Sequence, residues 1–429
     1  MKECHETPIR PRGALLRTTC IALLGFSWIL AGGAQGEDGD QNASDILRTI
    51  TIPTVDISAE KDRHVIVAEG TEDTYQGHAD TLVMPDGETL FAAWSIGHAV
   101  HIGPLARSDD GGESWNRIDV PSNWFDISNT PTIHRLEDPD GTERLFVFGG
   151  GLRQVDPDGG PPYPMYQAVS EDGGETWSPM ERNGLEGEVP PKSIKSFDGG
   201  ERLMMWSDMN AVGDEPAHVW QSVSTDGGQT WGEEEKIFET PARWAQPSVI
   251  RSPDGGQLLM LMRENSRQYN SLYSVSDDDG ETWSEPEELP AALTGDRHVI
   301  RYAPDGRLVV AMRDRAGQGI DDWDSPTYGH YVAWVGAYED IVEGREGDYR
   351  IKLLESHAGA DCGYSGLEIL PDGTFVATTY VKYRPDDPNH SVVSTRFRLD
   401  EVDRRLEVHQ SSAHAILSGG RLWSVSEVP

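Results

Sequence analysis

Two arginine–acid pairs follow closely similar apolar runs in this sequence. Arg263-Glu264 comes after Leu-Leu-Met-Leu-Met, and Arg313-Asp314 comes after Leu-Val-Val-Ala-Met. A guanidinium group binds a carboxylate or a sulfate through two parallel hydrogen bonds, which suits recognition of an anionic ligand. The alternative is that each arginine pairs with a neighbouring acid and only seals the interior. Because the pair recurs at the same place in two repeats, we favour a ligand-binding role for both arginines.

A tyrosine that could act as a nucleophile stands in the segment Cys362-Gly-Tyr-Ser-Gly-Leu-Glu368. A tyrosine flanked by cations and a carboxylate base can attack the anomeric carbon of a sugar. In that role Tyr364 would be catalytic, and Asp80 or Glu264 would carry protons as general acid and base. A structural tyrosine that caps the interior would look the same in sequence.

The elements that must position these residues are six β-hairpins. An Asp-Gly pair between two short apolar runs is a strong signal for a tight hairpin turn. Such pairs stand at Asp86-Gly87, Asp140-Gly141, Asp198-Gly199, Asp254-Gly255, Asp305-Gly306 and Asp372-Gly373. We therefore predict an all-β protein, a six-bladed β-propeller in which each hairpin begins one blade.

A second repeat, Ser-x-Asp-x-Gly-x-Ser/Thr-Trp, occurs at residues 108–115, 170–177, 224–231 and 276–283. Its spacing of 52 to 62 residues is that of one four-stranded unit. The aspartate can bond back to backbone amides and the glycine can adopt a positive φ, so we predict a structural turn. The spacing of the acids does not match an EF-hand, and we predict neither a metal nor another cofactor.

The propeller geometry brings distant residues together. Residues just before the first strand of each blade, and just after the second, reach the same face of the ring. The side chains gathered on that face are His78, Asp80, Asn129, Lys192, Trp244, Gln246, Asp296, Arg297, His298, Tyr364, Trp94, Arg153, Asp208, Arg263, Glu264, Arg313, Asp314, Arg315, Lys382 and Arg384. Among them we expect Tyr364, Asp80 and Glu264 to be catalytic. We expect substrate to be bound by Arg263, Arg313, Gln246, His78 and Arg297.

The formal net charge of −37 argues against nucleic acid and anionic membranes as partners. Residues 1–36 have the pattern of a secretory signal, with Lys2, Arg10, Arg12 and Arg17 before the apolar residues 20–30. A membrane anchor is the competing interpretation, but the stretch is short for a span. We expect a secreted or periplasmic protein with no membrane span in the mature chain.

The domain plan follows from these segments. We predict a signal peptide at 1–36, a polar leader at 37–54, the propeller at 55–402 and a poorly patterned C-terminal tail at 403–429. Residues 55–57 and 64–67 are expected to form short strands that complete the last blade and close the ring with residues 392–399. Only Cys362 remains after the signal, which excludes an internal disulfide, and we expect a monomer.

The four Asp-containing phrases are like Asp-boxes (BNR repeats). Together with the six hairpins, they make the mature chain resemble the sialidase (neuraminidase) superfamily of six-bladed β-propellers. Sialidases hold the substrate carboxylate with three arginines and attack with a tyrosine assisted by a glutamate. The resemblance implies that Tyr364 is the tyrosine, Arg263 the second arginine and Arg313 the third.

This chain departs from the family pattern at three places. His78 stands where the first arginine belongs, and Gln246 stands where the glutamate belongs. The loop 95–106, which should carry the acid/base aspartate, contains no carboxylate. Glutamine cannot take the proton of a tyrosine, so Asp80 or Glu264 is expected to do the acid/base work.

The resemblance implies a secreted, sialidase-like glycoside hydrolase that acts on a terminal sugar of extracellular glycans, with the arginines favouring an anionic sugar. Two alternatives stay open. The first is a propeller that binds glycans without turnover. The second is a polysaccharide lyase that uses a tyrosine or histidine base on a uronic acid and releases products that absorb ultraviolet light.

Overall fold

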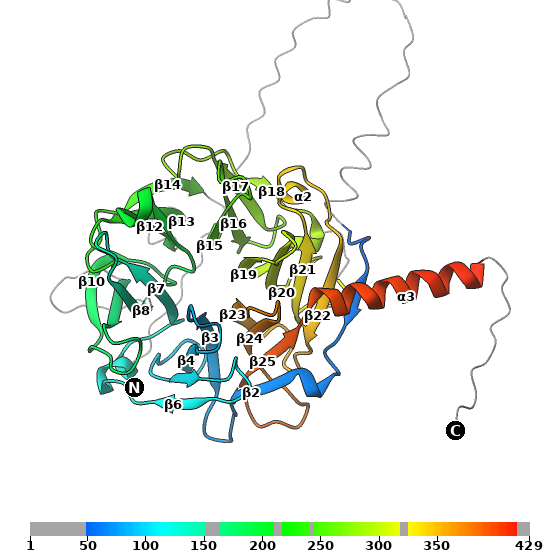
Figure 1. Cartoon of the computed structure of the whole chain (residues 1–429), viewed down its shortest axis with the longest axis horizontal. Coiled ribbons are helices and arrows are strands. Elements are labelled where there is room, and N and C mark those ends of the chain that lie inside the picture. Colours follow the sequence, from blue (N-terminus) through cyan, green and yellow to red (C-terminus); the bar gives the residue numbers. More distant parts are fainter. Residues whose placement is uncertain (1–48, 151–162, 210–216, 241–243, 318–324, 418–429) are drawn as a thin grey trace, which may run out of the picture. The chain divides into compact units, whose positions relative to one another are not determined.

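The computed structural model describes residues 49–150, 163–209, 217–240, 244–317 and 325–417. In this part of the chain, six β-sheets are arranged in a ring (Figure 1). This confirms the predicted six-bladed β-propeller. Each of the six Asp-Gly pairs lies in the turn between the first two strands of a blade.

The first three blades each have four strands that follow one another along the chain. Blade one consists of β3 (Gln76–Val83), β4 (Leu90–Ile96), β5 (Leu105–Ser108) and β6 (Asn116–Ile118). Blade two consists of β7 (Thr132–Glu137), β8 (Glu143–Gly150), β9 (Pro164–Ser170) and β10 (Glu181–Glu186). Blade three consists of β11 (Ile194–Phe197), β12 (Arg202–Met209), β13 (Ala217–Ser224) and β14 (Glu235–Thr240).

Blade four follows the same plan, whereas blades five and six each add an outer strand from the N-terminal part of the described chain. Blade four consists of β15 (Trp244–Arg251), β16 (Leu258–Glu264), β17 (Leu272–Ser276) and β18 (Glu287–Glu288). Blade five consists of β19 (Gly295–Tyr302), β20 (Leu308–Asp314), β21 (Tyr331–Gly336), β22 (Tyr349–Leu354) and β1 (Thr54–Asp56). Blade six consists of β23 (Cys362–Ile369), β24 (Phe375–Val381), β25 (Ser391–Phe397) and β2 (His64–Ala68).

The helices are short apart from one near the end of the described chain. They are η1 (Lys61–Arg63), η2 (Ser122–Asp126), η3 (Asp198–Gly200), η4 (Ala291–Leu293), α2 (Tyr338–Val342) and α3 (Leu399–Leu417). None of the helices in the described ranges is long and apolar enough to cross a membrane.

The ring closes through β2, as expected for residues 64–67. This strand pairs antiparallel with β25, with His64 opposite Thr395 and Ile66 opposite Val393. The expectation for residues 55–57 was wrong, because β1 runs parallel to β22 and adds a fifth strand to blade five. The physical reason is that β2 already occupies the outer edge of blade six. Ile57 is instead buried in the core between blades five and six.

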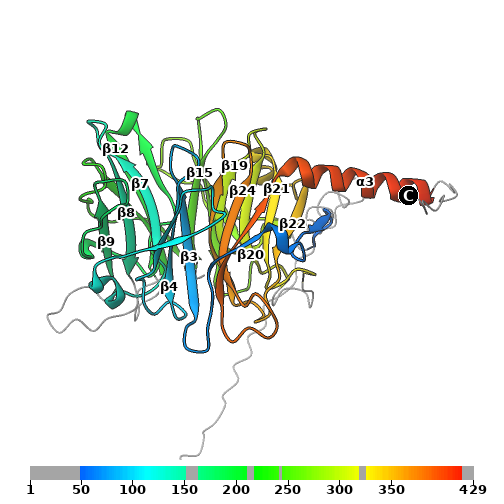
Figure 2. The same cartoon turned by 60° about the horizontal axis from the view of Figure 1, so that its bottom comes forward.

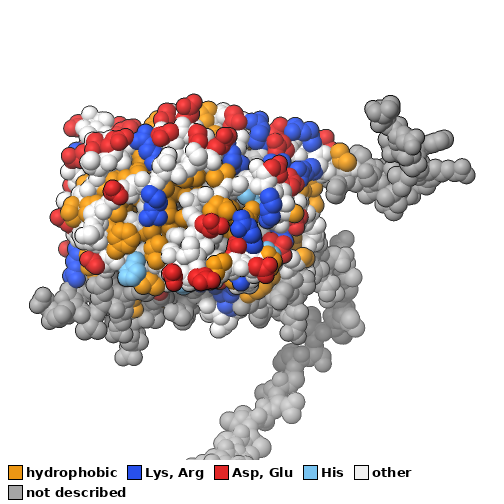
Figure 3. All heavy atoms as spheres, turned by 90° about the horizontal axis from the view of Figure 1, so that it is seen from below, with side chains coloured by type: hydrophobic (Ala, Val, Ile, Leu, Met, Phe, Trp, Pro, Cys, Tyr) orange, Lys and Arg blue, Asp and Glu red, His pale blue; other side chains and the backbone are white. Residues whose placement is uncertain are grey.

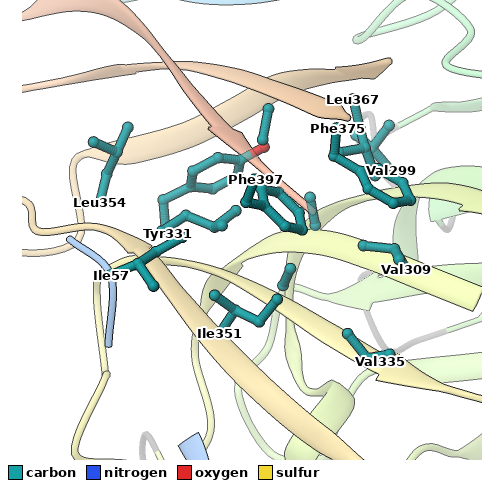
Figure 4. Close-up of a cluster of buried hydrophobic side chains, with 14 of the residues drawn as sticks. Ile57, Val299, Val309, Tyr331, Val335, Ile351, Leu354, Leu367, Phe375 and Phe397 are labelled. Atoms are coloured by element: carbon teal, nitrogen blue, oxygen red, sulfur yellow. The ribbon is translucent and has the colours of Figure 1, made fainter. Parts of the chain in front are cut away.

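That core shows how neighbouring blades hold together (Figure 4). Side chains of blade five, such as Val309 and Tyr331, pack against Leu367 and Phe375 of blade six, with Ile57 beside them. Burial of such apolar surface is worth about 25 cal/mol per Å². The blades are thus joined by packing, since the one cysteine in the described residues, Cys362, is a free thiol.

The repeated Asp-containing phrase forms the turn between the third and fourth strands of blades one to four. In blade three, Asp226 Oδ1 accepts hydrogen bonds from Ser224 Oγ at 2.8 Å and from the Thr230 amide at 2.9 Å. The Gly228 amide donates to Ser224 Oγ at 2.9 Å, and Gly228 has a φ of 88°. The phrase is a self-contained structural staple.

Helix α3 crosses the boundary that we drew at residue 402. It begins against the core, where Leu399 and Val402 are buried, and it extends outward from the ring (red in Figures 1 and 2). Ion pairs of Arg307 with Asp403 and of Arg63 with Glu401 hold its first turns. Residues 403–417, which we expected to be poorly patterned, are therefore helical. The predicted signal and most of the leader lie outside the described residues.

The surface mixes charges of both signs. On the face seen in Figure 3, acidic and basic side chains are interspersed, with apolar atoms between them. The anionic excess of the chain is therefore spread over this face and does not form a single patch there.

Candidate functional site

Four first strands carry a β-bulge near the same end of the ring. The register shifts between Gln76 and Ala79 in β3, and at the equivalent points of β15, β19 and β23. The residues inside the bulges include His78, Gln246, Arg297 and Tyr364. A bulge bends the strand and re-aims a side chain, and bulges are frequent beside active sites. The bulges therefore bring four of the predicted site residues to one end of the ring.

The backbone at these bulges is unusual. Gln246 and Arg297 have φ values of 59° and 58°, which L-residues rarely adopt, and Gly363 has a φ of 98° just before Tyr364. A non-glycine residue in this region costs on the order of 1 kcal/mol or more and persists where the surrounding structure imposes it. Such strain at two positions that flank one tyrosine indicates a functional constraint.

Tyr364 is the centre of the site. Its hydroxyl accepts hydrogen bonds from Gln246 Nε2 at 2.5 Å and from Arg263 Nη1 at 3.3 Å. The ring of His78 stacks on the tyrosine ring, with centroids 3.9 Å apart and an interplanar angle of 8°. The Arg297 guanidinium lies 5.3 Å from the same ring centroid. The structure thus brings together five of the eight predicted site residues.

Arg297 is the cation with the most open hydrogen-bonding capacity. Its side chain is only 2% exposed, yet among the described residues its guanidinium makes no hydrogen bond and no ion pair. Burial lowers the pKa of Arg297, and the negative groups Asp80 and Asp208 oppose that effect. A buried guanidinium has five N–H donors that need partners, so Arg297 is well suited to bind an anion.

Arg313 is placed differently from our expectation. Its Nε and Nη2 donate to Asp296 Oδ2 at 3.0 and 2.6 Å. Its Nη1 donates to the carbonyl oxygens of Ala360 and Cys362 at 2.6 and 3.0 Å. With these donors already used, Arg313 fits the structural interpretation, an arginine that pairs with a neighbouring acid, better than a substrate-binding role.

Asp80 and Glu264 also lie in structural contacts, which does not fit the acid/base roles expected for them. Asp80 forms a buried ion pair with Lys192 and accepts hydrogen bonds from the amides of Thr81 at 2.9 Å and Ile133 at 3.2 Å. Glu264 accepts from the amides of Ser266 and Gln268 at 2.6 and 3.0 Å and so closes its own loop. Both side chains are 2% exposed and are saturated by these partners.

A carboxyl group that we placed on this face, but did not select as catalytic, lies next to the tyrosine's partner Gln246. Asp208, at the end of β12, accepts a hydrogen bond from the Gln246 amide at 3.0 Å. Burial raises the pKa of Asp208 to about 7, and the nearby charge of Glu188 adds to the effect. An acid with a pKa near the working pH suits proton transfer. The available signal was its position, because Asp208 ends the second strand of blade three much as Arg263 does in blade four.

A second cluster of polar side chains, which we did not identify from the sequence, surrounds Asp361 on the same side of the ring. Its carboxylate lies 3.1 Å from His98 Nδ1 and 3.2 Å from His390 Nε2, and it accepts a hydrogen bond from Tyr75 at 2.9 Å. His98 in turn packs edge-on to His78, with centroids 4.7 Å apart. This network joins blades one and six and supports His78 behind Tyr364.

Two limits on the site follow from the described residues. No group of three or more His, Cys, Asp or Glu side chains there is placed to hold a metal ion. Arg153, which we also expected on this face, lies outside the described residues. In the described part of the chain, the side chains placed at Tyr364 are those of Arg263, Arg297, His78 and Gln246, and Asp208 lies next to Gln246.

Comparison with known proteins agrees with this architecture. Residues 209–316 match the family of BNR repeat-like domains. No curated protein matches the chain. Similar solved structures include the GH93 α-L-arabinofuranosidase of Fusarium graminearum with arabinobiose, at 14% identity and a TM-score of 0.59 over 79% of this chain and 98% of that one.

Two further structures show the same likeness. An α-L-arabinanase of Penicillium chrysogenum in complex with arabinobiose has 19% identity and a TM-score of 0.57, over 79% of this chain and 98% of that one. The intramolecular trans-sialidase of Ruminococcus gnavus has 17% identity and a TM-score of 0.52, over 79% and 97%. Residues 209–316 are thus BNR repeat-like, and the chain has a sialidase-like propeller fold that these glycoside hydrolases also have.

Proposed function

We propose that this protein is a glycoside hydrolase that binds a terminal anionic sugar beside Tyr364. The observation that carries the proposal is the buried Arg297 guanidinium, which lies over the tyrosine ring and has no hydrogen bond or ion pair in the described structure. A carboxylate or sulfate on the sugar would satisfy its donors through charge-assisted bonds. The sialidase-like fold supports the proposal, and the predicted signal at 1–36 is consistent with an extracellular glycan as substrate.

The proposed reaction uses Tyr364 as nucleophile and Asp208 as proton carrier. Tyr364 Oη forms a bond to the anomeric carbon while the glycosidic C–O bond breaks, and Asp208 accepts the phenolic proton. The leaving oxygen takes a proton from water, and the hydroxide then attacks the anomeric carbon. Tyr364 departs and recovers its proton from Asp208. Gln246 holds the two groups in place, because it bonds to both.

Replacing Tyr364 with Phe tests this proposal. The variant keeps the stack on His78 but removes the attacking oxygen, which also accepts the bonds from Gln246 and Arg263. We therefore expect a folded protein with melting lowered by a few degrees and a loss of turnover of about a thousandfold or more. Turnover is measured as reducing sugar released from oligosaccharides with anionic or neutral terminal sugars. Tyr302→Phe is the matched control, because that hydroxyl bonds to the Arg251 carbonyl oxygen, away from the site. Wild-type turnover in Tyr364→Phe would refute the nucleophile.

A polysaccharide lyase is a second candidate, favoured by His78. This histidine is buried, and the burial lowers its pKa well below the usual range, so the ring is neutral. Its Nδ1 contacts Thr130 Oγ1 at 2.8 Å, and its buried Nε2 has no hydrogen-bond partner in the described structure. A neutral imidazole stacked on a tyrosine could remove the proton next to a uronic acid carboxylate whose charge Arg297 neutralises. The electron pair of the C–H bond then forms the new double bond, the glycosidic C–O bond breaks, and the leaving oxygen takes a proton from water.

Product analysis separates the candidates. A hydrolase releases saturated sugars, whereas a lyase releases a product with a new double bond that absorbs in the ultraviolet. Binding without either product, in every glycan tested, would support the alternative of a glycan-binding propeller. The monomer that we expect is tested in the same preparation by its mass in solution.

A further inference from the structure

Four guanidinium groups surround one buried carboxylate next to the proposed site. Asp296 forms ion pairs with Arg263 at 3.0 Å, Arg267 at 2.8 Å, Arg313 at 2.6 Å and Arg315 at 3.5 Å. In the described part of the chain, Arg263, Arg267 and Arg313 have no other carboxylate within ion-pair distance. These three arginines and Asp296 therefore carry an excess of two positive charges even before Arg315 is counted, although the protein as a whole has a net charge of −37.

The electrostatics of the group agree with that excess. Burial alone would raise the pKa of Asp296, but Arg263, Arg313 and Arg267 hold it well below its usual range. Asp296 therefore already carries its negative charge, and the excess positive charge of the arginines is not reduced by any further ionisation of this residue. Removing like charges from water together is costly unless an opposite charge compensates them. A bound anion would supply that compensation.

The donors still open in this group belong to Arg267 and Arg263, because Arg313 uses four of its five N–H bonds on Asp296 and two carbonyl oxygens. Arg263 donates from Nη1 to Tyr364 and faces Asp296 with Nε, and its side chain is 15% exposed. Arg267 uses Nη1 and Nη2 on Asp296 and retains three of its five N–H bonds. Its side chain is 22% exposed, so a ligand can reach it.

The loop that carries Arg267 is built to hold it. Arg267 has a φ of 60°, a strained value for a non-glycine residue. The Glu264 carboxylate fixes this loop by accepting from the amides of Ser266, Gln268 and Tyr269 at 2.6, 3.0 and 3.3 Å. A strained arginine held by a dedicated cap is preorganised for binding, because little conformational entropy remains to be lost.

We propose that Arg267 forms a second anion-binding subsite, which takes a carboxylate or sulfate on the sugar next to the one at Tyr364. The two positions are separated by a single guanidinium, since Arg263 contacts both the Tyr364 hydroxyl and Asp296. The substrate is then a glycan with negative charges on successive sugars. This inference rests on the proposed function in one respect, the sugar placed at Tyr364.

The test compares ligands that differ in one charge. Digalacturonate and the same disaccharide with one carboxyl group reduced form the carboxylate pair, and a disulfated and a monosulfated disaccharide form the sulfate pair. The dissociation constants are measured by calorimetry. We expect the wild type to prefer the dianion of at least one pair by about 10- to 100-fold, the size of one charge-assisted contact. The pair that shows the preference identifies the anion.

Arg267→Gln should abolish this preference while its affinity for the monoanion stays within about threefold of the wild type. Arg267→Lys should keep part of it, since the charge stays but the planar fork is lost. Arg345→Gln is the control, because Arg345 pairs with Asp340 away from the site and should leave every constant unchanged. Melting curves show whether each variant is folded.

Three results would overturn the subsite: no preference for a dianion in the wild type, equal losses for both ligands in Arg267→Gln, or a preference that survives in that variant. Failure of the proposed function looks different. If Tyr364→Phe had no effect on turnover while the dianion preference vanished in Arg267→Gln, the chemistry at Tyr364 would be refuted and the subsite would stand.

Discussion

A guanidinium group binds a ligand only with the N–H donors that the protein leaves open, and this decides the roles of the arginines here. Both Arg297 and Arg313 were selected from the sequence by one rule, namely that residues beside the first two strands of a blade reach the same face of the ring. Arg313 uses most of its donors on Asp296 and on two carbonyl oxygens, whereas Arg297 is buried with no hydrogen bond or ion pair in the described structure. Sequence position could predict that both arginines lie on one face. It could not predict the count of open donors, which depends on contacts between blades.

The carboxylates show the same distinction. The sequence places Asp80, Asp208 and Glu264 at comparable ends of strands. Lys192 neutralises Asp80, and three backbone amides surround Glu264. Asp208 has the charge of Glu188 nearby and is buried, so its pKa is raised. The environment, and not the residue type, sets which acid can carry a proton.

The raised pKa of Asp208 predicts a specific pH dependence of stability. The folded value of about 7 lies above the unfolded value of about 4, so between these pH values the folded state holds a proton that the unfolded state has lost. The free energy of unfolding should therefore fall as the pH rises through this window. Asp208→Asn keeps an oxygen that can accept the bond from the Gln246 amide, and it removes the titration.

We expect Asp208→Asn to be more stable than the wild type at pH 8, by on the order of a few kcal/mol, with a smaller difference at pH 4. Its turnover should fall, and the limb of the pH–rate profile near pH 7 should disappear. Glu201→Gln, at an exposed position of the same blade, is the control. Parallel stability curves for wild type and Asp208→Asn between pH 4 and 8 would contradict the raised pKa.

At the scale of elements, local and non-local signals differ in what they reveal. Each Asp-Gly hairpin is specified within about 20 residues, so all six could be read from the sequence. The β-bulges could not, because Gln246 and Arg297 are not residues that favour a positive φ. They adopt it where the side chains contact a neighbouring blade, Gln246 through its bond to the Tyr364 hydroxyl and Arg297 through its place over the Tyr364 ring.

The Asp-containing turns predict an effect on stability without an effect on function. Asp226→Ala removes bonds to Ser224, to the Thr230 amide and to the Thr230 hydroxyl. We expect a loss of about 1–3 kcal/mol and a fall of several degrees in melting temperature, with unchanged turnover. Thr225→Ala changes an exposed, variable position of the same turn and serves as control. A loss of turnover with normal melting would mean that the turn contributes to the site.

At the scale of the whole molecule, the site depends on how the ring is closed. His78 of blade one stacks on Tyr364 of blade six, and the Asp361 network joins the same two blades. This is the seam that β2 closes when it pairs with β25 of blade six, because the chain then leads directly into blade one. The sequence could predict closure by β2, since the last blade lacked an outer strand. It could not assign β1, because a three-residue strand can complete any free edge.

The last prediction follows from this seam and uses two truncations. A chain that starts at residue 58 lacks β1 and Ile57 but keeps β2, so the ring stays closed. We expect it to melt at a lower temperature in one transition and to retain turnover, because blade five keeps its own four strands.

A chain that starts at residue 69 also lacks β2 and exposes the edge of β25. We expect this chain to unfold less cooperatively and to lose turnover, because blades one and six can separate and the stack of His78 on Tyr364 is then no longer held. The measurements are calorimetric melting and sugar release on the same preparations. If the chain from residue 69 matched the chain from residue 58 in both, the packing of the first strands around the axis, and not pairing by β2, would be what closes the ring and holds the site.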